Sequence, residues 1–209
     1  MSGLVLWDVD TQVDFMLPEG KLYVPGAEET APAMRQLVEA ARAAGLIHVA
    51  SADDHELTDP EISDDPDYQN TYPPHCLRGT PGAERIPETE QGDPLPLSLV
   101  PYPPGLVPDL VSGRREILLL KKNFNVFTNL NTDPLLEALD PDEIVLFGVA
   151  TDVCDDAAIR GFLQRGRKVR FVEDAARGLD EERVAAATKA WRESGVVFST
   201  AEDVIASLD

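Results

Sequence analysis

The chain has 209 residues, a length that suits one packed domain and leaves little room for a second independent core. Its 38 acidic residues outnumber its 18 lysines and arginines, so the formal net charge is -20. This charge repels nucleic acids and anionic membrane surfaces, and we expect neither of them as a partner.

The N-terminal stretch MSGLVLWDVD lacks the basic start of a secretory signal and soon reaches an acidic residue. No stretch approaches the roughly 18 apolar residues that a membrane span needs. We therefore expect a cytoplasmic protein in which the two cysteines, Cys76 and Cys154, are free thiols rather than a disulfide.

Short apolar runs alternate with stretches of helical periodicity along the chain. The apolar runs predict strands over 3–7, 46–50, 116–120, 143–149, 168–172 and 195–199. The periodic stretches predict helices over 28–45, 133–140, 152–166 and 180–195. Near-continuous apolar strands followed by helices are typical of a parallel sheet covered on both faces. The sequence thus predicts a three-layer α/β/α fold with a doubly wound, mostly parallel sheet.

Residues 53–113 interrupt this alternation. They hold most of the 17 prolines and many acidic residues, and no clear strand and helix pair is seen in them. Loops of this length in compact domains are usually functional or disordered. Because apolar strands continue after this region, we expect a single domain over 1–209 with an elaborated loop at about 53–113.

Polar side chains follow four of the predicted strands: Asp8, Asp10 and Asp14 after the first, Asp53 and His55 after the second, the lysines of KKNFNVF (121–127) after the third, and Cys154 after the fourth. In open parallel sheets, ligands bind outside the carboxyl ends of the strands. We therefore expect a carboxylate, a lysine and a cysteine to share one rim of the sheet. Taken singly each has an ordinary explanation, since a free cysteine is often only a small buried hydrophobe.

Cys154 falls in the predicted first turn of a helix, with Thr151 or Asp152 as its N-cap. A free thiol has a pKa near ~8.5, and a helix N-terminus or a nearby cation lowers it. We expect a lysine from an adjacent strand end to favour the thiolate in this way, although the acidic neighbours of Cys154 in the sequence oppose it. A carboxylate beside the thiol could take its proton and later return it to a leaving amine.

Five motifs together carry a resemblance to a known family: VDTQVDF (9–15), SADDH (51–55), YPPHCLRGTPGAE (72–84), KKNFNVF (121–127) and GVATDVC (148–154). In this order they resemble the isochorismatase-like cysteine hydrolases, and most of all the nicotinamidase/pyrazinamidase branch. The resemblance covers essentially the whole chain. It implies the isochorismatase-like hydrolase fold and an amidohydrolase that acts through a thioester.

The resemblance also implies a catalytic triad. Asp10 matches the general base that opens the D-x-Q-x-D-F pattern, and Cys154 matches the nucleophile that attacks the amide carbonyl. Lys121 fits the family pattern of a lysine followed by two aromatic residues, with Lys122 as the fallback. Family members carry a non-proline cis peptide bond before the nucleophile, here between Val149 and Ala150. The backbone N–H groups of Ala150 and Cys154 would then face the oxyanion.

The metal site and the pocket wall follow from the same resemblance. Asp53, His55 and His75 match a carboxylate and two imidazoles that would bind Zn²⁺, or alternatively Mn²⁺ or Fe²⁺. Relatives often supply a further ligand between these motifs, and among the acids of this chain the spacing favours Asp64. Phe15 and Tyr72 would bind the substrate, Tyr72 standing where relatives often have tryptophan.

The expected reaction is the hydrolysis of nicotinamide to nicotinate and ammonia. Two alternatives stay open at this point: another small amide or ureide, such as a carbamoyl or ureido acid, or a non-catalytic binding relative. Cys76 is the rival thiol, but it follows a proposed metal ligand in a proline-rich loop, so structural packing is expected for it. The partner is a small-molecule amide, and relatives suggest a homo-oligomer.

Overall fold

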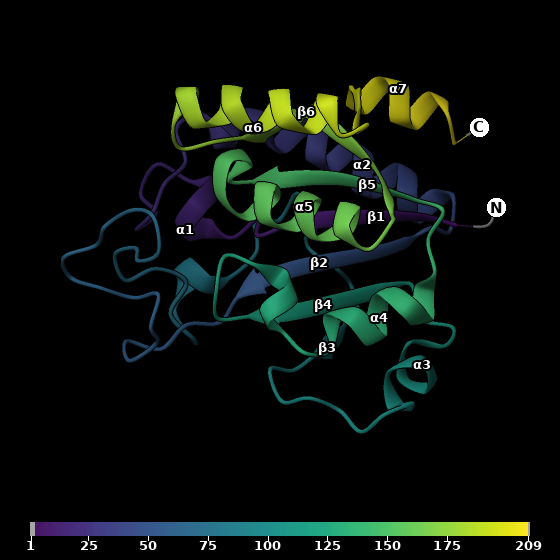
Figure 1. Ribbon diagram of the computed structural model, residues 1–209, viewed down its shortest axis with the longest axis horizontal. Coiled ribbons are helices and arrows are strands. Elements are labelled where there is room, and N and C mark those ends of the chain that lie inside the picture. The colour runs from purple at the N-terminus through teal and green to yellow at the C-terminus, as the bar shows by residue number, and fades with distance from the viewer. Residues whose placement is uncertain (1–2, 209) are drawn as a thin grey trace.

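The computed structural model describes residues 3–208, and its strands form one seven-stranded sheet in the order β3-β4-β2-β1-β5-β6-β7 (Figure 1). Every neighbouring pair of these strands is parallel. The strands are β1 (Leu4–Val9), β2 (Ile47–Asp53), β3 (Leu95–Leu97), β4 (Glu116–Lys121), β5 (Glu143–Val149), β6 (Lys168–Arg177) and β7 (Val197–Ser199). The predicted α/β class and parallel sheet are thereby confirmed.

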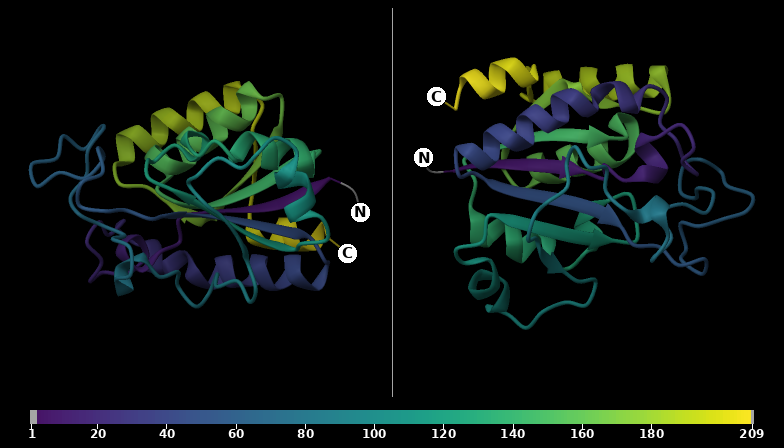
Figure 2. Two further views of the ribbon diagram at one scale, coloured as in Figure 1. Left: turned by 90° about the horizontal axis from the view of Figure 1, so that it is seen from below. Right: turned by 180° about the vertical axis from the view of Figure 1, so that it is seen from behind.

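The helices cover both faces of the sheet, as the two views of Figure 2 show. They are α1 (Val13–Met16), α2 (Ala31–Ala43), α3 (Leu106–Val111), α4 (Thr132–Leu139), α5 (Asp156–Gln164), α6 (Glu181–Glu193) and α7 (Ala201–Ala206). Side chains of α3, α4, α5 and α6 join one core cluster, and those of α1, α2 and α7 join a second. None of the described helices is long and apolar enough to cross a membrane.

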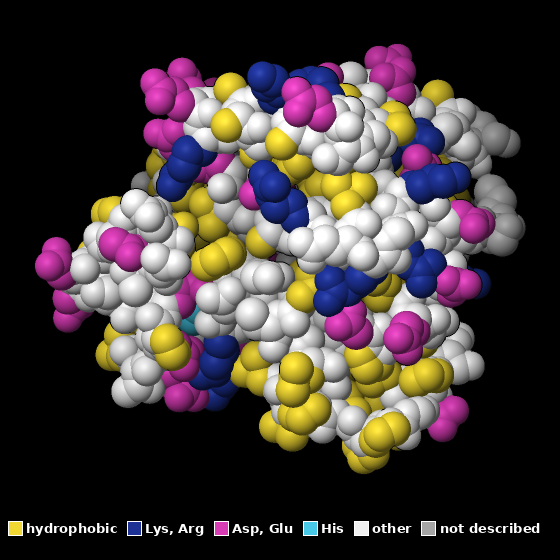
Figure 3. All heavy atoms as spheres, viewed as in Figure 1, with side chains coloured by type: hydrophobic (Ala, Val, Ile, Leu, Met, Phe, Trp, Pro, Cys, Tyr) yellow, Lys and Arg dark blue, Asp and Glu magenta, His cyan; other side chains and the backbone are white. Residues whose placement is uncertain are grey.

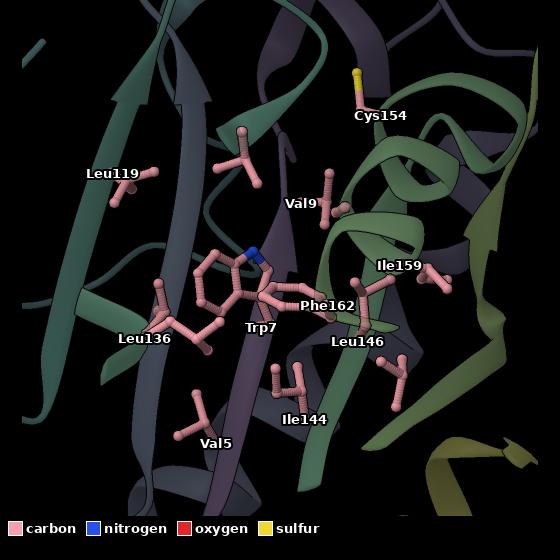
Figure 4. Close-up of a cluster of buried hydrophobic side chains, with 14 of the residues drawn as sticks. Val5, Trp7, Val9, Leu119, Leu136, Ile144, Leu146, Cys154, Ile159 and Phe162 are labelled. Carbon is pink, nitrogen blue, oxygen red and sulfur yellow. The ribbon is translucent and has the colours of Figure 1, made fainter. Parts of the chain in front are cut away.

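Strand β1 shows why the sheet is buried on both faces. Val5, Trp7 and Val9 belong to the core cluster under α4 and α5, whereas Leu6 belongs to the cluster under α2. This follows from the alternation of side chains along a strand. Trp7 lies at the centre of the first cluster, with its ring 4.7 Å from that of Phe162 (Figure 4).

Helix α2 illustrates how the sequence positions a helix on this sheet. Its buried side chains, Met34, Leu37, Val38 and Ala41, recur at helical spacing and form a single apolar stripe. The chain leaves the helix through Gly45, whose φ of 67° lies in the left-handed region that glycine adopts without strain.

The long interruption at 53–113 contains regular structure that the sequence analysis did not anticipate. The short strand β3 pairs with β4 at the edge of the sheet, and α3 follows it. Proline is tolerated in β3 because an edge strand leaves part of its backbone outside the ladder. Residues 56–80 run as loops beyond the carboxyl ends of the strands, at the left of Figure 1, and the loop from β3 to α3 runs along the lower edge of that view.

The strand order reverses beside β1. The chain passes from β1 to β2 and then to β4 on one side, and β5 then returns to the other side of β1. Gly148 permits this approach, because a side chain there would collide with the Val9 backbone and its φ of 135° excludes most residues. A crevice at such a reversal is the usual ligand site of an open parallel sheet.

Candidate active site

Three predicted residues meet at this reversal. Lys121 ends β4 directly opposite Asp53 in the β2–β4 register, and Asp10 follows the last residue of β1. The Lys121 Nζ atom lies 2.9 Å from Asp10 Oδ2 and 2.5 Å from Asp53 Oδ1. Cys154 Sγ is 4.0 Å from the same Nζ atom. The sheet therefore brings together an aspartate, a lysine and a thiol from three different strand ends.

Lys121 is fully buried, and it is charged because of its partners. Burial alone would lower its pKa, but the carboxylates of Asp10 and Asp53 raise the pKa well above its ordinary value. Lys122 points outward, is partly exposed and binds Asp59 Oδ1 at 2.8 Å. The structure thus favours Lys121 over Lys122 as the lysine of the cluster, because strand alternation sends the two side chains to opposite faces.

Asp10 adopts a backbone conformation that is uncommon outside glycine, with φ of 51°. Its Oδ1 accepts a hydrogen bond from Ser51 Oγ at 2.7 Å, and its other oxygen faces Lys121. Burial raises the pKa of Asp10, Lys121 partly offsets this, and Asp53 raises the pKa further. A carboxylate with a raised pKa beside a thiol suits an exchange of protons.

Cys154 lies at the upper margin of the core cluster, and its sulfur points away from Trp7 and Val9 (Figure 4). It belongs to a π-helical turn, Thr151–Asp155, that precedes α5. Burial raises its pKa well above the ordinary value of a thiol, and Lys121 offsets this only in part. Lys121 thus lowers the pKa of this thiol, as expected of a nearby cation, but burial and the carboxylates around it outweigh the lysine.

The expected caps of this helix were wrong. Ala150 stands at the N-cap position, and no side chain makes a capping hydrogen bond there. Asp152 instead accepts a hydrogen bond from the Leu179 backbone at 2.7 Å and pairs with Arg183 Nη2 at 2.9 Å. The peptide bond between Val149 and Ala150 is cis, as the resemblance implied.

Four buried side chains form a group that could hold a metal ion: Asp53, His55, Glu61 and His75. One donor atom from each lies within 4.8 Å of the others. Asp53 Oδ2 is 3.7 Å from His55 Nε2 and 3.6 Å from His75 Nε2. The three residues expected from the sequence are all in this group.

The fourth member corrects the expectation of Asp64, which is exposed and outside the group. Glu61 Oε1 lies 4.0 Å from His55 Nε2, and Glu61 Oε2 accepts a hydrogen bond from the Phe124 backbone at 2.8 Å. Sequence spacing alone could not separate Glu61 from its acidic neighbours. In the structure the Glu61 carbonyl accepts from the Tyr72 N–H at 2.8 Å, a contact between loop segments that the sequence does not reveal.

The donor set fits a divalent transition metal ion. The His55 side chain is fully buried; its Nδ1 lies 3.4 Å from Asp59 Oδ2, and among the described residues no hydrogen-bond partner is found for its Nε2. His75 Nδ1 lies 2.7 Å from the Pro73 carbonyl, an arrangement that leaves Nε2 free to bind a metal. Two imidazoles and two carboxylates are ligands that Zn²⁺, Fe²⁺ and Mn²⁺ accept.

A small, mostly apolar pocket opens over Cys154 and the metal group. Phe15 and Tyr72, the two residues expected to contact substrate, both line it, and Phe124 and Ala150 complete its walls. The Phe15 and His75 rings are 5.2 Å apart. Figure 3 shows hydrophobic side chains between the loop at the left and the body of the molecule. The pocket suits a small flat molecule with little charge.

Two further residues, Gln12 and Asp14, hold this site together. Gln12 donates from Nε2 to the Asp53 carbonyl at 2.8 Å and accepts at Oε1 from the Asp53 backbone N–H at 2.7 Å. Asp14 Oδ2 accepts from the Cys76 backbone at 2.7 Å, so this acid orders the loop that follows His75. Cys76 itself is buried, and burial raises the pKa of its thiol well above the ordinary value.

Comparison with known proteins agrees with this arrangement. The model of the isochorismatase domain matches residues 99–203. The nicotinamidase/pyrazinamidase of Mycobacterium tuberculosis (strain ATCC 25618 / H37Rv) is 31% identical over 201 residues, which cover 94% of this chain and 97% of that protein.

Solved structures share the fold. The pyrazinamidase of Pyrococcus horikoshii in complex with zinc superposes with a TM-score of 0.73 at 22% identity, covering 95% of this chain and 99% of that one. The N-carbamoylsarcosine amidase of Thermoplasma acidophilum gives a TM-score of 0.72 at 25% identity, covering 96% and 97%. The match along almost the full length of a relative, together with the domain match, shows that this chain belongs to the isochorismatase family of hydrolases.

Proposed function

We propose that this hydrolase is a cysteine amidohydrolase whose substrate is a small uncharged amide, with nicotinamide as the first choice. The observation that carries the proposal is the buried cluster in which Lys121 Nζ lies 2.9 Å from Asp10 and 4.0 Å from Cys154 Sγ. A thiol, a proton acceptor and a cation at one point supply what nucleophilic cleavage of an amide needs.

In the proposed reaction, the Cys154 thiol gives its proton to Asp10 as its sulfur bonds to the carbonyl carbon. The negative charge that forms on the carbonyl oxygen is stabilised by the backbone N–H groups of Ala150 and Cys154. The carbon–nitrogen bond then breaks, and Asp10 returns the proton to the departing nitrogen, which leaves as ammonia. A thioester on Cys154 remains.

Hydrolysis of the thioester reverses these roles. Asp10 takes a proton from a water molecule as the water oxygen attacks the acyl carbon, and the sulfur leaves with that proton as the restored thiol. Lys121 keeps its positive charge throughout, because two carboxylates hold its pKa well above the ordinary value. Its charge stabilises the thiolate and holds Asp10 in place.

A divalent ion, with zinc as the first choice, would be held by Asp53, His55, Glu61 and His75. Such an ion supplies positive charge and open coordination positions for water or for a ring nitrogen of the substrate. The zinc complex of the Pyrococcus horikoshii pyrazinamidase supports this choice of metal.

The pocket wall favours nicotinamide over the alternative, a carbamoyl or ureido acid. That alternative has support from relatives, since one similar structure is an N-carbamoylsarcosine amidase. A substrate with a free carboxylate needs a cation to pair with. Among the described residues that line the pocket there is no arginine or lysine, whereas Phe15, Tyr72 and Phe124 offer rings. An aromatic amide without charge matches this lining.

Ammonia release by the zinc-loaded protein tests the proposal, with nicotinamide, pyrazinamide, N-carbamoylsarcosine and a ureido acid as substrates. We expect the first two to be hydrolysed and Cys154→Ala to reduce the rate at least ~1,000-fold. Cys76→Ala is the matched control, because the Cys76 thiol is directed at the Gly82 carbonyl, 3.8 Å from its sulfur, and this variant should retain activity.

Two results would contradict the assignment. Preference for the carbamoyl and ureido acids would establish the alternative substrate class. Retention of activity in Cys154→Ala, with loss in Cys76→Ala, would move the nucleophile to the other thiol.

A further inference from the structure

Asp8 is a buried charge where the strand pattern calls for an apolar side chain. It shares its face of β1 with Leu6, which belongs to the apolar cluster beneath α2. Asp8 has no exposed surface, so an ionised form needs a partner of opposite charge. The mechanism proposed above gives this carboxylate no task.

Its partner is Arg85, from the loop that follows His75. Arg85 Nη2 binds Asp8 Oδ2 and donates to the Thr89 carbonyl at 2.9 Å, and its side chain is 9% exposed. His48 Nε2 lies 3.4 Å from the same Asp8 oxygen. Burial opposes ionisation of Asp8, but Arg85 and His48 together lower its pKa below the ordinary value. The two residues thus form a buried ion pair.

The other Asp8 oxygen reaches the turn that carries Asp10. Thr11 Oγ1 donates to Asp8 Oδ1 at 3.0 Å and lies 2.6 Å from Thr89 Oγ1. Thr11 directly follows Asp10 in the chain, so its side chain connects the ion pair to the backbone of the turn that carries Asp10. Asp10 itself has the left-handed φ of 51°, a conformation that its surroundings must hold.

The backbone around Arg85 pairs with the same turn. Gln12 and Arg85 form an antiparallel bridge, the Ile86 N–H donates to the Thr11 carbonyl at 3.0 Å, and the Val13 N–H donates to the Glu84 carbonyl at 2.8 Å. Gln12 in turn clamps Asp53 on both sides of its backbone. One loop segment, 84–89, thus packs against the turn 10–13 through backbone hydrogen bonds, and the ion pair of Asp8 with Arg85 holds the same segment from the side of β1.

We infer that Asp8 and Arg85 are positioning residues, which through Thr11 hold the turn 10–13 so that Asp10 faces Lys121 and Cys154. The inference rests on the proposed amidohydrolase function for its kinetic consequence, but the placement of the turn does not depend on the substrate. Catalytic groups lose rate steeply when they move by about an ångström, by as much as ~100-fold.

Two variants test the inference in the zinc-loaded protein with nicotinamide as substrate. Thr11→Val keeps the shape of the side chain and removes the link to Asp8, so kcat should fall ~10-fold with KM changed less than ~3-fold. The double variant Asp8→Val/Arg85→Met removes both charges of the Asp8–Arg85 pair together, and kcat should fall ~100-fold. Because the two charges are removed together, we expect the double variant to fold, and a thermal melt checks this.

The matched control is another ion pair of this sheet, Arg170 with Glu143, which lies 2.8 Å apart at the amino ends of β5 and β6. The variant Glu143→Gln/Arg170→Met should retain wild-type kcat and KM. Hydrogen exchange followed by mass spectrometry supplies a readout that does not need activity. The peptide that spans residues 10–15 should exchange at least ~10-fold faster in Thr11→Val and in Asp8→Val/Arg85→Met than in wild type. In the control variant its exchange rate should be unchanged.

The outcomes separate the two proposals. Unchanged exchange in this peptide, or wild-type kcat in a folded Thr11→Val or double variant, overturns the positioning role. Faster exchange in the variants, confined to this peptide, supports the positioning role. If the wild-type protein also releases no ammonia from any of the amides, the amidohydrolase proposal is overturned while the positioning role stands.

Discussion

Lys121 is a buried cation among carboxylates, and this arrangement predicts what its removal does. Lys121→Met leaves Asp10 and Asp53 facing each other without a counter-charge. We expect the free energy of unfolding to fall by about 3–5 kcal/mol and ammonia release to fall at least ~100-fold. Urea unfolding and the nicotinamide assay measure the two effects.

Lys122→Met is the matched control for this experiment. The Lys122 side chain is 28% exposed in its pair with Asp59, and solvent screens that pair. We expect a change of at most about 1 kcal/mol and a nearly normal rate. A larger loss of activity in Lys122→Met than in Lys121→Met would reverse the assignment of the lysine.

The burial of the Asp155 carboxyl group predicts that the stability of the protein depends on pH. Its side chain is fully buried, and no hydrogen-bond partner is found for either carboxylate oxygen among the described residues. Burial, with Asp10 and Asp152 nearby, raises its pKa well above 3.8. Between pH 3.8 and the pKa of the folded state, the folded protein holds a proton on Asp155 that the unfolded chain has released. The contribution of protonated Asp155 to the free energy of unfolding is therefore full below pH 3.8, and it is lost as pH rises through the pKa of the folded state.

Asp155→Asn removes this titration. Its free energy of unfolding, relative to wild type, should increase as pH rises above 3.8, as measured by urea unfolding at several pH values. The same difference at every pH would show that Asp155 does not bind the extra proton.

Individual residues show where sequence reasoning succeeds and where it stops. Cys154 and the carboxylates and lysine at the strand ends were accessible, because parallel strands bring their carboxyl ends to one edge, and the family resemblance selected Asp10 and Lys121 among them. Glu61 was not, because it lies in an irregular loop among several acids, where spacing carries no directional information. The net pKa of Cys154 was also out of reach, because it depends on burial and on carboxylates from other elements.

Helix α7 carries its own start signal, and this makes it a test of local stability apart from the site. Thr200 Oγ1 accepts from the Asp203 N–H at 3.2 Å, and the Asp203 carboxylate accepts from the Thr200 N–H at 3.4 Å, which is a capping box. Thr200→Ala should lower the free energy of unfolding by about 1 kcal/mol and leave the rate unchanged.

Thr188→Ala is the control, because Thr188 lies inside α6 and only bonds back to the helix backbone. Alanine favours a helix interior, so stability should be unchanged or slightly higher. Equal losses in the two variants would show that the cap has no special effect.

The elements that the sequence predicted are the long, strongly apolar ones. Strand β5 was predicted at its observed bounds, Glu143–Val149, because seven residues between a proline-acid turn and the ATD motif leave few alternatives. Strand β3, with three residues and a central proline, and the six-residue helices α3 and α7 were missed. Elements this short owe their structure to packing against the sheet, since local propensity cannot sustain them.

The metal group should affect the stability of the whole molecule. Asp53 and Glu61 are buried close together, and bound metal offsets their repulsion and favours the folded state by mass action. We expect one equivalent of zinc per chain by elemental analysis, and a melting temperature that falls by several degrees in a chelator and recovers when zinc is returned.

His55→Ala is the variant to compare, since it removes one ligand from the group. Its melting temperature should respond weakly to zinc. A full response in this variant would place the ion elsewhere in the molecule.

Glu61 gives the ion an influence beyond charge. One oxygen of this carboxylate belongs to the metal group, the other accepts the Phe124 N–H, and the Glu61 backbone pairs with Tyr72. Two aromatic walls of the pocket are therefore connected to the coordination sphere through one residue. If the group holds an ion, we expect its radius to reach the pocket through Glu61, so that exchanging one divalent ion for a larger one changes which amides are hydrolysed as well as how fast they react.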